Sequence, residues 1–147
     1  MDIKDVQKIA REFKKKLTVK VGILGTSEPR DDPSDSNYEI GKRHEFGEGG
    51  MKQRSFLRLT YMMKEQDYKK YLEENKDKFL QEVLNNGIEA ALAEMGRWWV
   101  EEVQNTFEMQ GYGNWPAISD EWAEEKGSRI ILTHTGALKR SITFEVS

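Results

Sequence analysis

The spacing of apolar residues changes from a helical period to a strand period within the first 23 residues, and this change constrains the fold most. From about Asp2 to Lys16, apolar side chains recur every three or four positions, which predicts an amphipathic helix. Residues 17–23 then alternate between apolar and polar, which predicts a half-buried strand. The chain is therefore expected to combine helices and strands in one fold.

The middle of the chain is predicted to be mainly helical. A helical period runs over residues 67–84, stops at an Asn-Asn-Gly C-cap at 85–87, and resumes over 88–107. Residues 56–63 alternate instead, and we interpret them as a second strand, with a helix start as the alternative. Residues 38–50 are interpreted as a short turn followed by a glycine cluster.

The remaining segments complete an α+β pattern. A short helix is predicted over 119–126, a short strand over 130–132, and a final strand over 142–146, where Ile142 begins an alternation. Two long loops, about 25–37 and 109–117, are predicted to be mobile. We expect a single α+β domain over the whole chain, with a small antiparallel or mixed sheet packed against three to four helices.

The composition excludes several kinds of protein. The chain has no cysteine, which rules out disulfide frameworks, thiolate zinc sites and cysteine nucleophiles. No apolar run approaches the ~18 residues of a membrane span, and the charged first residues predict no signal peptide. The 23 Lys and Arg against 26 Asp and Glu give a net charge of −3, which disfavours a dedicated binder of duplex DNA. We expect a soluble protein of a reducing cytoplasm, without membrane contact.

No residue pattern points to catalysis, a metal or a cofactor. His44-Glu45 begins like the helix of a zinc protease, but the second histidine would fall at position 48, which is Glu48. His44 is therefore interpreted as a surface or turn residue. The glycines at 47–50 match neither the GxGxxG spacing nor the Walker spacing of phosphate-binding loops. We expect a protein that is not an enzyme and has no cofactor.

Three residues are candidates for contacts with other proteins. Adjacent helical residues point about 100° apart, so Trp98 and Trp99 cannot both lie in the centre of one apolar stripe. Trp99 falls on the stripe, whereas Trp98 lies at its edge and is a candidate interface anchor. A wide buried stripe that contains both is the alternative. Trp115, in the second long loop, and Arg54, in the basic cluster 52–54, are the other candidates.

Two motifs give the chain a resemblance to a known family. The first is His44-Glu45-Phe46-Gly47, followed by Arg54-Ser55-Phe56-Leu57-Arg58. The second is Trp115-Pro116-Ala117-Ile118-Ser119, then Lys126, then Ile131-Leu132-x-x-Thr135-Gly136-x-Leu138-x-x-Ser141-Ile142. Together they resemble the virion-morphogenesis proteins of tailed phages, also called tail-completion or neck proteins. Ser55 stands where that family usually has proline.

The resemblance implies a structural protein at the junction of head and tail, working as part of a ring in the virion and present in the host cytoplasm during assembly. Its partners would be copies of itself and a head–tail connector, tail terminator or tail-tube protein, with DNA only passing through the ring. The motif residues would build the fold and carry no chemistry; they are His44, Glu45, Phe46, Gly47, Phe56, Leu57, Thr135, Gly136, Leu138, Ser141 and Ile142. In this interpretation Thr135 caps a single helical turn, and Leu138 packs one turn before Ile142.

Two other functions stay open. One is a cytoplasmic nucleic-acid-associated or regulatory binding module that uses the basic clusters Lys14–Lys16 and Lys52–Arg54. The other is a small hydrolase that uses His44 with a nearby carboxylate.

Overall fold

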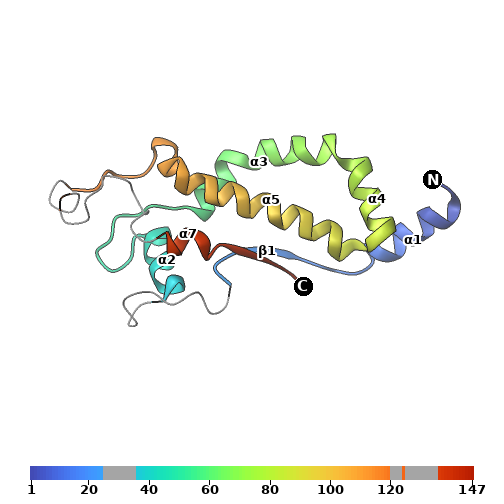
Figure 1. The fold of residues 1–147 in the computed structure, drawn as a ribbon, viewed down its shortest axis with the longest axis horizontal. Helices are drawn as coiled ribbons and strands as arrows, with labels where there is room; N and C mark the ends of the chain where they lie inside the picture. Colours follow the sequence, from blue (N-terminus) through green and yellow to red (C-terminus); the bar gives the residue numbers. More distant parts are fainter. Residues whose placement is uncertain (25–35, 120–123, 125–135) are drawn as a thin grey trace.

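A long central helix organises the molecule. The computed structural model describes residues 1–24, 36–119, 124 and 136–147. Figure 1 shows an elongated shape along α5, with α1 and α4 at one end and α2 and α7 near the other. The elements in chain order are α1 (Ile3–Phe13), β1 (Val19–Gly22), α2 (Asn37–Phe46), α3 (Leu57–Glu74), α4 (Lys76–Asn86), α5 (Ile88–Glu108), the 3₁₀ turn η1 (Gln110–Gly113), α7 (Ala137–Arg140) and β2 (Thr143–Val146).

The sheet of the described residues pairs a strand near the start of the sequence with a strand near its end. β1 and β2 pair antiparallel, with Val19 opposite Val146 and Gly22 opposite Thr143. One face of the pair packs on α5, where a Cβ atom added to Gly96 would lie 2.5 Å from the Phe144 ring. Glycine at 96 therefore lets the sheet approach the helix closely. The predicted first and last strands, and the α+β class itself, are confirmed.

The described residues form two apolar clusters along α5. The larger one gathers six buried residues from four parts of the chain, namely Phe56, Val103, Phe107, Trp115, Leu138 and Ile142. The smaller one lies toward the α1 end and contains Val83, Ile88 and Ala91, with Ile9 and Leu17 packed against it. Apolar burial is the main stabilising contribution in both.

Residues 56–63 are not a strand; they form the end of a loop and the first turns of α3. Phe56 and Thr60, four residues apart, are both buried, which is a helical spacing. The Thr60 Oγ1 atom lies 2.5 Å from Thr106 Oγ1 of α5. Of the residues predicted to share one strand face, Tyr61 and Met63 are exposed, so the alternation does not correspond to a buried strand face.

Residues 37–46 form helix α2 rather than a turn. Ser36 caps it, since its side chain accepts a hydrogen bond from Glu39 N. The helix ends at Gly47, which has a φ of 72° in the left-handed region that favours glycine. The glycine cluster therefore ends a helix that the sequence interpretation did not recognise.

Of the other predicted elements, some are confirmed, one helix is interrupted, and several lie outside the described residues. The predicted helices over 2–16 and 88–107 are α1 and α5, whereas the one over 67–84 is interrupted at Asn75, between α3 and α4. Gly87 ends α4 as predicted, at a φ of 91°. Most of the loop 25–37, much of the helix 119–126 and the strand 130–132 lie outside the described residues. In the part of the chain that is described, no helix is long and apolar enough to cross a membrane.

Candidate functional site

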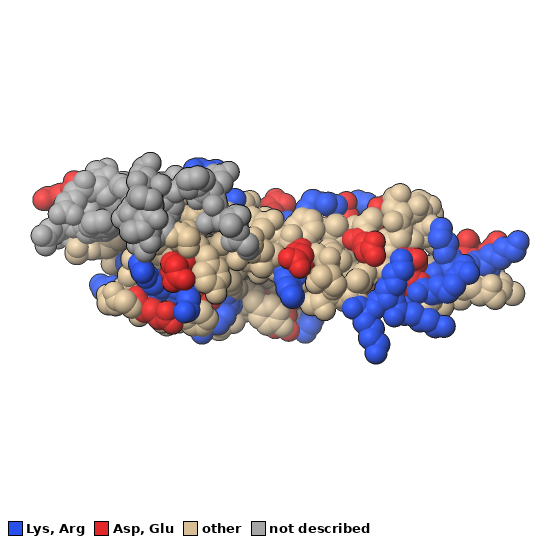
Figure 2. All heavy atoms as spheres, turned by 90° about the horizontal axis from the view of Figure 1, so that it is seen from below, with Lys and Arg blue, Asp and Glu red and all other residues tan. Residues whose placement is uncertain are grey.

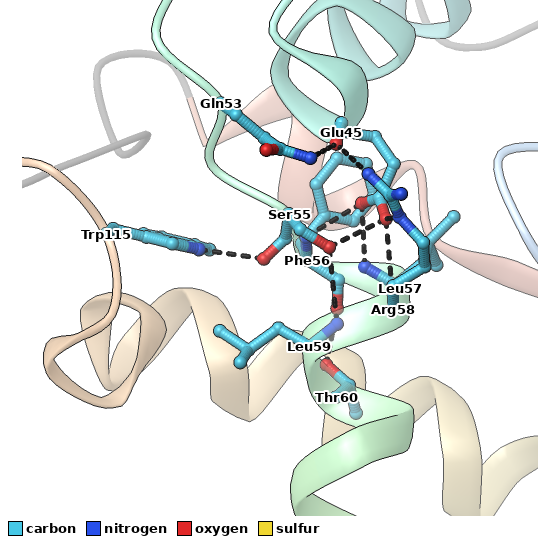
Figure 3. A network of polar contacts seen from close by, with 9 residues as sticks. All are labelled: Glu45, Gln53, Ser55, Phe56, Leu57, Arg58, Leu59, Thr60 and Trp115. Carbon is cyan, nitrogen blue, oxygen red and sulfur yellow. Dashed lines mark hydrogen bonds and ion pairs between the residues drawn. The ribbon is translucent and has the colours of Figure 1, made fainter.

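The first motif is organised around the carboxylate of Glu45, at the start of helix α3 (Figure 3). The side chain of Phe56, at the N-cap position, cannot accept a hydrogen bond, and α3 has no cap of its own. Glu45, which is 4% exposed, accepts the backbone N–H groups of Phe56 (2.8 Å), Leu57 (2.9 Å) and Arg58 (3.1 Å). The first N–H groups of a helix have no intrahelical partner and favour negative charge. Glu45 of α2 thus caps α3 from outside.

Side chains on both sides complete this cap. Ser55 Oγ donates to Glu45 Oε1 at 2.7 Å, and Arg58 Nε donates to the same oxygen at 3.0 Å. The Glu45 backbone carbonyl accepts from Arg58 Nη2 (2.6 Å) and Gln53 Nε2 (3.2 Å). We call Glu45, Gln53, Ser55, Arg58 and the α3 N-terminus the capping junction.

The environment of Glu45 keeps its carboxylate ionised. Burial raises the pKa of this group, but hydrogen bonds from the Leu57 backbone, the Ser55 hydroxyl and the Arg58 and Phe56 backbones oppose it. Together these bonds hold the pKa of Glu45 below its usual value. A charged carboxylate with all of these donors is a structural cap, because none of its hydrogen-bonding capacity is directed at a ligand.

Arg54 lies inside the fold and joins the two motifs. The residue is 8% exposed; its Nε donates to the Pro116 carbonyl at 3.0 Å and its Nη2 to the Ala117 carbonyl at 3.3 Å. Its backbone N–H donates to the His44 carbonyl at 2.7 Å. The prediction that Arg54 is an interface residue is therefore corrected, because its buried guanidinium binds carbonyl groups of its own chain.

Trp115 is also part of the interior and is likewise corrected as an interface candidate. It is 7% exposed, its Nε1 donates to the Ser55 carbonyl at 2.7 Å (Figure 3), and its ring meets Phe107 edge-on at 5.8 Å. A Cβ atom added to Gly111, whose φ is 72°, would lie 2.3 Å from the ring. Glycine at position 111 therefore allows the Trp115 ring to pack directly against this turn.

The C-terminal motif reaches the same place. Leu138 and Ile142 are buried beside Phe56, and Ser141 Oγ donates to the Leu138 carbonyl at 2.6 Å. Gly136 stands before α7 with a φ of 66° and makes no side-chain cap. Thr135, the predicted cap, lies outside the described residues.

The other residues of the first motif lie at its edge. His44 is half-buried on α2 rather than in a turn, and Phe46 is exposed, with the Arg58 guanidinium 4.7 Å from its ring centre. Among the residues that the structure describes, no group of three His, Cys, Asp or Glu could hold a metal ion. His134 lies outside that part of the chain.

Trp98 and Trp99 both belong to a cluster of rings between α3 and α5. Trp98 lies 5.2 Å from Tyr68 and 5.5 Å from Tyr71, and Trp99 lies 4.9 Å from Tyr68 and 5.9 Å from Tyr61, between ring centres. Both tryptophans are half-buried. Burial therefore does not separate a core Trp99 from an edge Trp98, and that division stays a prediction. We call Trp98, Trp99, Tyr61, Tyr68 and Tyr71 the aromatic cluster.

Three residues of the aromatic cluster, Tyr61, Tyr68 and Trp99, line an apolar groove of about 520 Å³. One wall is a face of α3, the other is β1, and α5 contributes the floor; the lining residues are Val19, Val21, Leu57, Tyr61, Glu65, Tyr68, Lys69, Leu72, Trp99 and Val103. The sequence interpretation missed this groove because it treated the start of α3 as a strand. The helical spacing of Leu57, Tyr61, Tyr68 and Leu72 was the signal that could have revealed it.

Comparison of the chain with protein-family models, with curated proteins and with solved structures gave no match.

Proposed function

We propose that the chain is a structural protein of the phage neck or tail-completion class, which joins head and tail as part of a ring. It would act without catalysis or a cofactor, at the head–tail junction of the virion, after assembling in the host cytoplasm. Its partners would be copies of itself and a connector, tail terminator or tail-tube protein. DNA would only pass through the ring.

One observation carries this proposal: the two motifs that resemble the family converge on a single core. Phe56 of the first motif packs with Leu138 and Ile142 of the second, and Arg54 binds the carbonyl groups of Pro116 and Ala117. Because these motif residues contact one another in the interior, they are expected to maintain the fold. This is typical of a family whose shared residues are structural rather than catalytic. Among the described residues, the aromatic cluster and the groove are then available for contacts with partners.

A deletion of the gene in the genome that encodes the chain tests the proposal. Electron microscopy of the lysate should show DNA-filled heads and finished tails that are not joined. Purified protein added to this lysate should restore joined, infectious particles, whereas the Glu45→Ala variant, which is expected to be strongly destabilised, should restore fewer. Joined particles at normal yield in the deletion lysate would contradict the neck assignment.

A nucleic-acid-associated or regulatory binding module is the second candidate, and one observation favours it. Lys14, Lys15 and Lys16 are exposed, and Lys and Arg side chains gather at the α1 end of the molecule (Figure 2). The second basic cluster offers less, because Arg54 is buried. Retention on DNA that falls steeply with salt concentration, and disappears when the three lysines become glutamine, would support this candidate.

A further inference from the structure

Helix α1 is attached to the domain by only part of its surface. Ile9 packs against the smaller apolar cluster, and Phe13 meets the Phe79 ring at 6.3 Å. Lys8 Nζ donates to the Leu84 carbonyl at 2.5 Å, and Glu12 Oε2 accepts the Ile88 N–H at 2.9 Å. These contacts fix the second half of the helix to α4 and to the start of α5.

The first half of α1 carries an exposed apolar face that belongs to neither apolar cluster of the described residues. Ile3 is 76% exposed and Val6 is 54% exposed, and both lie on the same helical stripe. The helix is nevertheless well formed at this end, since Asp2 and Asp5 make a reciprocal capping box. Figure 1 shows α1 extending beyond the turn between α4 and α5. The apolar side chains of a well-capped helix are thus exposed to solvent at this end of the molecule.

The same chain has a groove of matching chemistry and length. Along α3 the groove extends from Leu57 to Leu72, which is about 22 Å at 1.5 Å per residue, while the 11 residues of α1 span about 16 Å. Tyr61, which lines this groove, is 55% exposed. An amphipathic helix that lays its apolar face into a hydrophobic groove is a common mode of recognition.

The segments that carry the two surfaces have opposite net charges. Residues 2–16 contain six Lys and Arg against three Asp and Glu, a net charge of +3. Helix α5, the floor of the groove, contains one Arg against five Glu, a net charge of −4, while the charged residues that line the groove, Glu65 and Lys69, balance each other. Figure 2 shows the basic side chains gathered at the α1 end. Opposite charges on two patches of one chain favour contact between copies and disfavour α1 against α1.

We propose that the apolar face of α1, centred on Ile3 and Val6, docks into the groove between α3 and β1 of a second copy of this chain. Because the two patches differ, the contact runs head to tail and closes into a ring if the rotation permits. The contact rests on the proposed function in requiring that the chain works as such a ring. The helix cannot enter its own groove while Lys8 and Glu12 hold it at the α4–α5 end.

A disulfide cross-link tests this contact, since the chain contains no cysteine. Full-length Ile3→Cys is mixed with full-length Tyr61→Cys under mild oxidation, at high protein concentration and again in lysate in which heads and tails are being joined. We expect a covalent dimer that forms only in the mixture. The matched control mixes Ile3→Cys with Glu145→Cys, an exposed residue on the polar side of β2, and should give little dimer. Equal yields in both mixtures, or no cross-link in either setting, would overturn the inference.

A charge substitution on the helix provides a second test. Ile3→Glu should weaken self-association, measured by light scattering or sedimentation, by roughly 100-fold, because it removes an apolar contact and adds a buried charge. Lys4→Gln lowers the charge of the same helix by the same amount, but on the face away from the apolar stripe, and should weaken it far less. Both variants should melt like the parent, since both positions are exposed.

The outcomes separate this contact from the proposed function. If Ile3→Glu joins heads to tails as well as the parent does, the contact is wrong and the neck assignment stands. If the cross-link forms but deletion of the gene leaves joining normal, the contact stands and the neck assignment is wrong. If Ile3→Glu instead abolishes binding of a monomeric protein to anionic lipid vesicles, and no cross-link forms, α1 is a membrane-surface helix and the inference fails.

Discussion

A carboxylate from another helix caps a helix start at each end of the molecule, but the two ends are built differently. Glu45 is buried and holds α3 through three backbone N–H groups, with Ser55 and Arg58 at its sides. Glu12 is more exposed and holds α5 through the single N–H of Ile88. Hydrogen bonding to Ile88 lowers the pKa of Glu12, as the cap lowers that of Glu45.

The difference separates a scaffold from a surface made for contact. At the α2 end, the motif side chains are buried and paired within the chain, so changes there act on folding. At the α1 end, no residue of α1 is buried and the first half of its apolar stripe, Ile3 and Val6, faces solvent, so changes at these two positions are expected to leave folding intact and to act on association. Four comparisons of stability test this division.

The largest effect is expected from Glu45→Ala. It leaves several buried donors without an acceptor and leaves Arg58 without its ion-pair partner, which should cost about 3–5 kcal/mol of unfolding free energy. Urea or thermal unfolding measures the loss. Glu48→Ala, three residues on, removes only an exposed pair with Lys42 at 3.8 Å and should cost less than ~0.5 kcal/mol. Equal losses in the two variants would show that Glu45 is not the cap on which α3 depends.

The same substitution at the two ends compares the regions directly. Ile142→Ala removes a 4% exposed side chain from the larger apolar cluster and should cost about 2–5 kcal/mol. Ile3→Ala removes an exposed side chain and should change stability by less than ~0.5 kcal/mol. Both are read from chemical unfolding. A destabilisation by Ile3→Ala as large as that of Ile142→Ala would mean that α1 is part of the folding core.

The aromatic cluster should respond at an intermediate level. Trp98→Ala and Trp99→Ala each remove a half-buried ring and its ring contacts, which predicts similar losses of about 1–3 kcal/mol. Met62→Ala, at an exposed position of α3, should be close to neutral. If Trp98→Ala melts like the parent and Trp99→Ala is strongly destabilised, the two rings are not equivalent and the predicted edge assignment of Trp98 is supported.

The smallest effect is expected from changing pH. Because the pKa of Glu45 is lower in the folded state than in the unfolded chain, its ionisation stabilises the fold above the unfolded value of about 4.3. That contribution is lost as pH falls through the folded value. Glu45→Gln lacks the titrating group, so the stability difference between parent and variant should shrink below about pH 4.3. A difference that stays constant down to low pH would indicate that the charge of Glu45 contributes nothing.

Prediction from sequence succeeded where the pattern itself reports burial. The alternation of Ile142, Phe144 and Val146 predicted β2, because a pleated strand turns successive side chains to opposite faces. It failed at residues 56–63, where a similar alternation continued into exposed residues of α3. The spacing of so few residues fits both periods, and the cap that decides between them comes from Glu45, eleven residues earlier.

The candidate surfaces show the same limit. Sequence identified Trp98 and Trp99 as unusual, but not the three tyrosines of α3 that share the cluster with them. Trp115 and Arg54 have the residue types of interface anchors, yet the fold buries both. Residue type gives the capacity for a contact, while burial depends on segments about sixty residues away, such as Ser55 for Trp115.

The sequence by itself therefore determined the periodic elements, namely the helix over 2–16, the strand after it, α5 and the final strand, because these depend on local spacing. It also determined the net charges of the α1 segment and of α5. Only the tertiary structure decided that Glu45 caps α3, that the two motifs meet around Phe56, and that a groove opens between α3 and β1. Those features join residues from distant parts of the chain, and their energies come from burial and hydrogen bonds that no local pattern encodes.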